Sequence, residues 1–75
     1  MFSPMSATTI AIEVNGEPRD VPEGSSVADL LDLLGARRDG IAVERNRTLV
    51  RRSEFQRARL APGDRIEVVT LVGGG

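Results

Sequence analysis

One stretch of the chain has the sequence Ser26-Val27-Ala28-Asp29-Leu30-Leu31-Asp32-Leu33-Leu34-Gly35. Its apolar residues recur at the i, i+3, i+4 and i+7 positions of a helix, namely Val27, Leu30, Leu31 and Leu34. Ser26 and Asp29 have the spacing of a capping box, and Gly35 suits the left-handed residue that ends a helix. Because so short a helix is marginal by itself, we expect its apolar stripe to pack on a sheet.

The residues before this helix have the two-residue period of a β-hairpin. Residues 9–14 alternate apolar with polar or small side chains, and Asn15-Gly16 follows as a tight turn. A second strand is expected over residues 17–21. Pro18 has no N–H to donate to a ladder, so this strand should lie at a sheet edge.

The residues after the helix predict two further strands and a short one. The alternation over residues 41–44 predicts a third strand that ends near Asn46, and Leu49-Val50 predicts a short fourth. Phe55 is expected to anchor an irregular or single-turn segment to the core. The last strand begins at Arg65, after a strong turn. This order of elements indicates an α+β domain, with a mixed sheet of four to five strands and one main helix on one face.

The last strand is predicted to have one buried and one exposed face. Ile66 and Val68 should meet the helix, since the opposite face carries two charged residues. That opposite face also carries Val69 and Leu71, beside Ala42 if the third strand is a neighbour. Because small exposed apolar patches often mark docking sites, these three residues are candidates for partner docking, although ordinary surface residues would look the same.

The chain ends in Gly73-Gly74-Gly75, directly after an apolar, β-branched run. Glycine is the least hindered residue, so such a tail can enter a narrow active site of another protein. One interpretation is that Gly75 carries the reacting carboxylate on a flexible tail. The alternative is a frayed terminus.

Composition argues against an autonomous enzyme. The chain has no Cys and no His, and all ten cationic residues are Arg. It therefore lacks a thiolate nucleophile, the usual general base, a Schiff-base amine and the Cys and His ligands of metal sites. We predict no catalytic, cofactor-binding or metal-binding residue, and a role as a substrate, carrier or binding module.

Charge is distributed unevenly around a net charge of −1. Residues 36–59 hold eight arginines and three acidic residues, whereas the remainder holds two arginines and eight acidic residues. The arginines are interpreted first as a solvated face, with docking to a charged partner as the alternative. Nucleic acid is not expected as a partner, because only two residues are aromatic.

The domain organisation is simple. We expect a loose leader over residues 1–8, one domain over residues 9–72 and a flexible glycine tail over residues 73–75. Residues 1–8 lack the positive start and apolar core of a signal peptide. A cytoplasmic protein without a membrane partner is therefore the expectation.

Six segments occur in a distinctive order: Val14-Asn15-Gly16-Glu17, Ser26-Val27-Ala28-Asp29-Leu30-Leu31, Gly40-Ile41-Ala42-Val43 leading to Asn46, Arg52-Ser53-Glu54-Phe55, Pro62-Gly63-Asp64-Arg65 and the terminal glycines. Together they resemble the ThiS family, the sulfur-carrier proteins of thiamine biosynthesis, from about residue 9 to residue 75. The family usually has an apolar or small residue in place of Arg45 and commonly Pro in place of Arg51. These departures bear on partner docking more than on chemistry.

The resemblance implies a ubiquitin-like β-grasp fold and a sulfur-transfer cycle. An E1-like adenylating enzyme would use Mg-ATP to convert the Gly75 carboxylate to an acyl-adenylate. Sulfur from cysteine, usually through a cysteine desulfurase persulfide, would displace AMP and leave a thiocarboxylate. Thiazole synthase would then take that sulfur for the thiazole of thiamine.

Three alternatives remain at this stage. The small subunit of molybdopterin synthase shares the fold and the terminal chemistry, although the compact hairpin and short middle favour thiamine. A β-grasp interaction module whose tail never reacts is the second, and ubiquitin-like conjugation is the third. Fold alone does not separate them.

Overall fold

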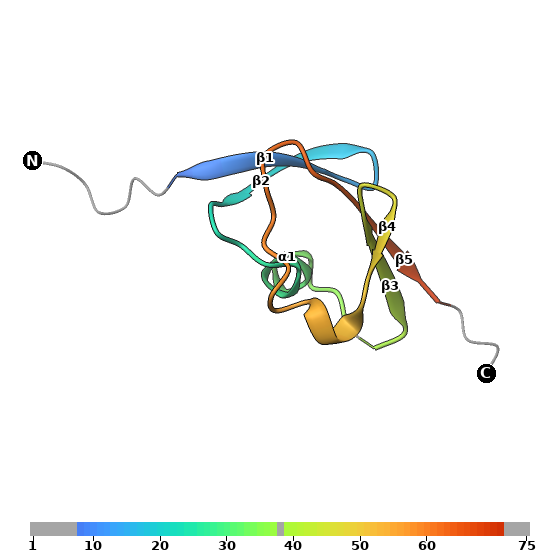
Figure 1. Cartoon of the computed structure of the whole chain (residues 1–75). Helices are drawn as coiled ribbons and strands as arrows, with labels where there is room; N and C mark the ends of the chain where they lie inside the picture. Colours follow the sequence, from blue (N-terminus) through green and yellow to red (C-terminus); the bar gives the residue numbers. More distant parts are fainter. Residues whose placement is uncertain (1–7, 38, 72–75) are drawn as a thin grey trace, which may run out of the picture.

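The computed structural model describes residues 8–37 and 39–71. The elements of this part of the chain are β1 (Thr9–Val14), β2 (Glu17–Pro22), α1 (Val27–Leu34), β3 (Ile41–Arg45), β4 (Thr48–Val50), a single 3-10 turn η1 (Arg52–Glu54) and β5 (Arg65–Thr70) (Figure 1). Residues 1–7 of the predicted leader and the whole glycine tail lie outside the described residues. The last leader residue, Thr8, is described, and its carbonyl accepts a hydrogen bond from the Glu23 N–H at 2.9 Å.

The five strands form one mixed sheet in the order β2-β1-β5-β3-β4. β1 and β5 are parallel at the centre, and the other pairs are antiparallel. The prediction that the second strand lies at an edge is confirmed. α1 lies across one face of this sheet, so the architecture is a β-grasp, as predicted (Figure 1).

Local sequence signals form the helix and its ends as expected. The Ser26 hydroxyl accepts a hydrogen bond from the Asp29 N–H at 3.1 Å, and the Asp29 carboxylate accepts one from the Ser26 N–H at 2.9 Å. Gly35 adopts the left-handed conformation, with φ 68°. The predicted apolar stripe packs on the sheet, although Leu34 is only partly buried.

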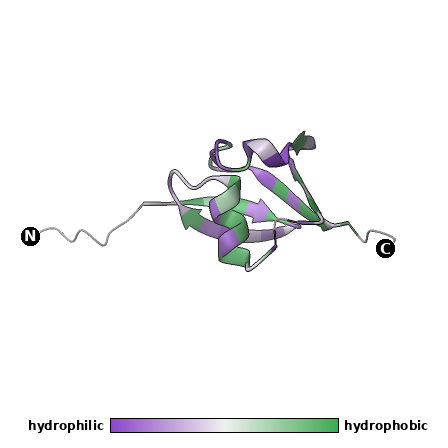
Figure 2. Ribbon diagram, turned by 90° about the horizontal axis from the view of Figure 1, so that it is seen from below, coloured by the Kyte–Doolittle hydropathy of each residue, from purple (hydrophilic) through white to green (hydrophobic). Residues whose placement is uncertain are grey.

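The core lies between α1 and the inner face of the sheet. Its buried apolar residues are Ile10, Ile12, Val14, Val21, Val27, Ala28, Leu30, Leu31, Val43, Phe55, Leu60 and Ile66. Hydrophobic and hydrophilic positions alternate along the strands in Figure 2, as expected for a sheet with one buried face. Phe55 follows the 3-10 turn and is 3% exposed, which confirms the predicted anchor.

The other face of the sheet carries no helix within residues 8–37 and 39–71. No helix in this part of the chain is both long and apolar enough to cross a lipid bilayer. The open face of the sheet is available to another molecule, and β5 is one of the strands that form it.

Candidate functional site

The candidate site is the end of β5, where the chain leaves the sheet. β5 begins between two strands: Val14 of β1 pairs with Ile66, and on the other side Arg45 of β3 pairs with the same residue. β1 ends at Val14, so from that point β5 has a strand partner on the β3 side alone.

Asn15 replaces the missing strand partner beside β5. Its side-chain oxygen accepts a hydrogen bond from the Val68 N–H at 2.9 Å, and its side-chain amide donates to the Val68 carbonyl at 3.4 Å. The backbone N–H of Asn15 donates to the Ile66 carbonyl at 2.9 Å. The side chain of Asn15 thus holds the middle of β5 in place. The sequence predicted Asn15 as a turn residue but did not predict this contact.

Asn46 holds the start of β5 in the same manner from the opposite side. Its backbone N–H donates to the Arg65 carbonyl at 2.8 Å, and its side-chain oxygen accepts from the Arg65 N–H at 2.9 Å. Asn15 and Asn46 both have a φ of 51°, which Asn tolerates better than most residues. Two hairpin turns therefore fix the strand that leads to the tail.

The last hydrogen bond of the described chain joins Leu71 to the turn before β3. The Leu71 N–H donates to the Gly40 carbonyl at 2.7 Å, and Gly40 has a φ of +69° that favours glycine. The predicted reacting tail, Gly73, Gly74 and Gly75, lies beyond this point and outside the described residues. The sheet therefore holds the chain as far as Leu71.

An exposed apolar patch surrounds this exit. Val69 is 48% exposed and Leu71 54%, as the strand alternation predicts, and Ala42 is the half-buried residue opposite Val69. The structure adds Leu49, which is 61% exposed and pairs with Glu44 on the same face. We call Ala42, Leu49, Val69 and Leu71 the exit patch. Sequence reasoning missed Leu49 because its face depends on its pairing with β3.

The open face becomes acidic away from the exit patch. Glu44 of β3 lies directly opposite Glu67 of β5. Like charges directly opposite one another in a sheet are unfavourable. Arg47 and Arg65 line the same small pocket as these two glutamates, so part of this charge is balanced.

The described residues include no group of three or more His, Cys, Asp or Glu able to hold a metal ion. The most buried acidic side chain, Asp64 at 8% exposure, serves a turn. It accepts hydrogen bonds from the Ala61 N–H at 2.9 Å and the Asn46 side-chain amide at 3.1 Å. Because the Asp64 carboxylate accepts these two hydrogen bonds, it holds the turn before β5 in place.

Comparison with known proteins identifies the family of the chain. A model of the ThiS family matches residues 9–75. The chain belongs to the ThiS family. The chain is similar to the crystal structure of the thiamine biosynthesis protein ThiS from Geobacter metallireducens, with a TM-score of 0.77 and 32% sequence identity. The match covers 88% of this chain and 100% of the Geobacter chain.

One relative of the chain is a small protein of similar length, and another is a much larger protein. The sulfur carrier protein ThiS of Thermus thermophilus is 37% identical over 62 residues, which are 83% of this chain and 95% of that protein. The thiazole synthase of Magnetococcus marinus is 41% identical over 64 residues, which are 85% of this chain and 20% of the synthase. The chain thus spans about a fifth of that synthase, so a ThiS-like segment is part of a larger protein there.

Proposed function

We propose that this ThiS protein carries sulfur for thiamine biosynthesis on the carboxylate of Gly75. The observation that supports this most strongly is the family match, which extends over the domain and through the terminal glycines. Named relatives include a sulfur carrier protein and thiazole synthases. The carrier would be a co-substrate of other enzymes.

The proposed reaction begins with activation of the carboxylate. A carboxylate is a poor electrophile, because its oxygen is a poor leaving group. An E1-like adenylating enzyme would join it to the AMP part of Mg-ATP and release pyrophosphate. The terminal sulfur of a persulfide, derived from cysteine through a cysteine desulfurase, would attack the carbonyl carbon and expel AMP. A thiol would then reduce the resulting acyl disulfide, become part of a new disulfide and release the thiocarboxylate. The thiocarboxylate would then donate its sulfur to thiazole synthase.

The chain's own contribution is presentation of the tail. The sheet holds β5 through Asn15 and Gly40 as far as Leu71, and glycines without side chains can pass through a narrow channel beyond it. The chain has no Cys, His or Lys, so we assign the side-chain catalysis to the partner enzymes.

The exit patch is the proposed docking surface for those enzymes. Val69, Leu71 and Ala42 were expected from the strand pattern, and Leu49 extends the same apolar area. A partner that covers this patch would receive the tail directly beside the contact. A few well-buried residues near the centre of such a contact commonly carry most of the binding energy.

Intact mass spectrometry tests the proposal. The purified full chain is incubated with the adenylating enzyme, Mg-ATP and a sulfur donor. We expect a species heavier by the difference between sulfur and oxygen, formed only when ATP is present. A variant without Gly74 and Gly75 is the matched control and should stay unchanged. An unmodified Gly75 after incubation with active enzyme would overturn the proposal.

A further inference from the structure

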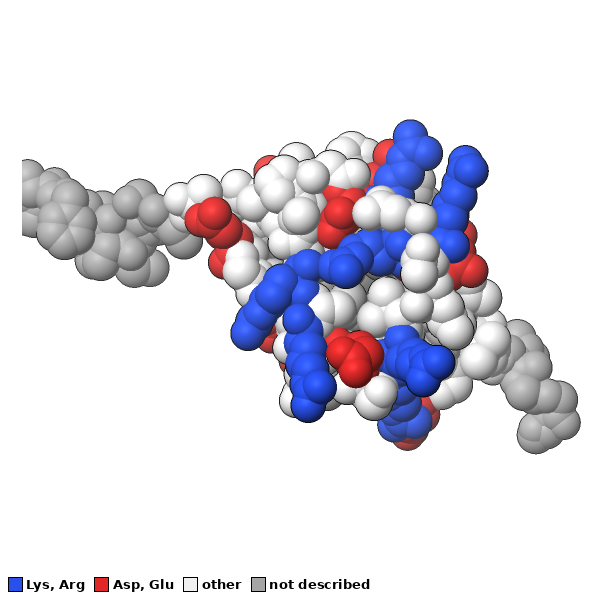
Figure 3. All heavy atoms as spheres, in the orientation of Figure 1, with Lys and Arg blue, Asp and Glu red and all other residues white. Residues whose placement is uncertain are grey.

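Arginine side chains gather around a groove beside β4, which shares Leu49 with the exit patch but none of its other residues. Figure 3 shows them spread over the face that β4 and η1 occupy in the view of Figure 1. The groove has a volume of about 590 Å³. Its charged lining residues are Arg45, Arg51, Arg57 and Glu54, so the arginines outnumber the acid.

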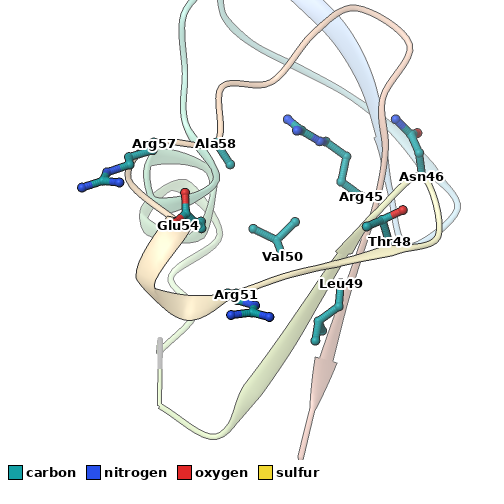
Figure 4. Close-up of a pocket in the computed structure, with 9 residues that line it drawn as sticks. All are labelled: Arg45, Asn46, Thr48, Leu49, Val50, Arg51, Glu54, Arg57 and Ala58. Atoms are coloured by element: carbon teal, nitrogen blue, oxygen red, sulfur yellow. The ribbon is translucent and has the colours of Figure 1, made fainter.

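The floor of the groove is apolar. Val50 and Ala58 are partly buried against the core, and Figure 4 shows both pointing into the space between β4 and the segment after η1. Arg45 enters the same space, where its Nη1 donates to the Arg59 carbonyl at 2.6 Å and lies 3.9 Å from Asp64. Arg45 therefore has a structural role, which corrects the interpretation of all the arginines as a solvated face.

Arg51 and Arg57 differ from Arg45. Both are exposed, and within residues 8–37 and 39–71 their side chains form neither a hydrogen bond nor an ion pair. By contrast, Arg52 is paired with Asp39, and the Arg59 side chain donates to the Gly24 carbonyl at 2.9 Å. Two unused guanidinium groups on the rim of an apolar groove favour an acidic ligand.

The groove also runs along a free edge of the sheet. β4 is the last strand in the sheet order and pairs with β3 alone. In an antiparallel ladder, alternate residues direct their backbone N–H and C=O groups away from the partner strand. Such an edge can accept a further extended strand.

The two edges of this sheet are not equivalent. β2, at the other edge, contains Pro18 and Pro22, which lack an N–H and obstruct strand pairing. β4, Thr48–Val50, contains no proline and is rich in β-branched residues. The arginines thus lie beside the edge that can accept a strand.

We propose that the free edge of β4 and the arginine groove beside it bind an extended acidic segment of a protein partner. The segment would pair its backbone with β4 over about 10 Å, the length of three strand residues. Its acidic side chains would contact Arg51 and Arg57, and an apolar side chain would lie over Val50 and Ala58. This binding is independent of the chemistry at the tail.

The test uses a synthetic peptide and the full chain. The probe is Glu-Asp-Val-Glu-Val-Asp-Glu with blocked ends, titrated into isotope-labelled protein and followed by amide NMR. We expect shift changes in Thr48–Arg51 and at Arg57 and Ala58. Replacing both Arg51 and Arg57 by Glu should weaken binding about tenfold or more, because two attractions become repulsions.

Matched controls separate the charge from the strand pairing. An Arg19→Glu and Arg37→Glu variant changes the net charge equally, at positions outside the groove lining, and should bind the probe within about twofold of the parent chain. A probe methylated on alternate backbone nitrogens keeps its charges but loses donors, and should bind weakly. The Arg51→Gln and Arg57→Gln variant repeats the test if the Glu variant loses its dispersed NMR spectrum.

Several results would overturn the proposal. One is that the probe causes no shift change at β4. The others are that the methylated probe binds as tightly as the unmethylated one, or that the Arg19→Glu and Arg37→Glu control loses as much affinity as the Arg51 and Arg57 variant. Tighter binding of a single-stranded RNA probe to the same residues would identify the groove as a nucleic-acid site instead. None of these results depends on whether Gly75 becomes a thiocarboxylate, so the two proposals fail separately.

Discussion

The side-chain amide of Asn15 pairs with both backbone groups of Val68, a residue 53 positions away in the sequence. It accepts from the Val68 N–H at 2.9 Å and donates to the Val68 carbonyl at 3.4 Å. A turn residue therefore acts as a short strand beside β5 where β1 has ended. This contact links the stability of the first hairpin to the position of the C-terminal exit.

Replacing Asn15 by Gly tests that link. Glycine accepts the φ of 51° at this position, so the substitution removes the side chain with little backbone strain. We expect the free energy of unfolding in urea to fall by about 1 kcal/mol, because water replaces part of the lost hydrogen bonding at this exposed site. Amide hydrogen exchange at Val68 should accelerate. Unchanged exchange at Val68 would show that the Asn15 side chain does not hold β5.

Replacing Asp64 by Ala should have a larger effect on stability. Asp64 is buried and accepts hydrogen bonds from the Ala61 N–H and from Asn46, which itself holds the start of β5. We expect a loss of about 2 kcal/mol in urea unfolding, because donors at a partly buried site lose their acceptor. The control is Asp20→Ala at an exposed position of β2, which should change stability little. Equal losses would argue against a special role of Asp64.

Replacing Leu71 by Asp should weaken docking more than folding. Leu71 is 54% exposed, so little apolar area is lost from the core, but a charge enters the exit patch. We expect affinity for the adenylating enzyme to fall about tenfold or more, measured by calorimetry. Leu33 of α1 is 53% exposed and lies outside the exit patch, so Leu33→Asp is the matched control. A larger effect on stability than on binding would remove Leu71 from the docking surface.

Deleting Gly74 and Gly75 should abolish sulfur transfer and leave the melting temperature unchanged. The buried apolar core of the described residues extends from Ile10 to Ile66, and glycine has no side chain to add to it. In cells that lack the gene, the full chain should restore growth without added thiazole, and the shortened chain should not. Rescue of the deletion strain by molybdopterin, with no requirement for thiazole, would assign the carrier to the other pathway.

Much of the fold is predictable from the sequence because its signals are local. The capping box of Ser26 and Asp29, the left-handed end at Gly35 and the turn at Asn15 each act within a few residues. Strand alternation correctly separated Ile66 and Val68, which meet the core, from the exposed Val69. The order of these elements, with the terminal glycines, also indicated the family.

Only the tertiary structure decided which residues from distant parts of the sequence are neighbours. Leu49 joins the exit patch only because β4 pairs with β3, and Asn15 reaches Val68 only because β1 and β5 are neighbours. The division of the arginines into structural and unused groups depends on contacts such as that between Arg45 and the Arg59 carbonyl. A sequence determines local conformation through steric and hydrogen-bonding preferences of adjacent residues, whereas these contacts exist only after distant segments have paired.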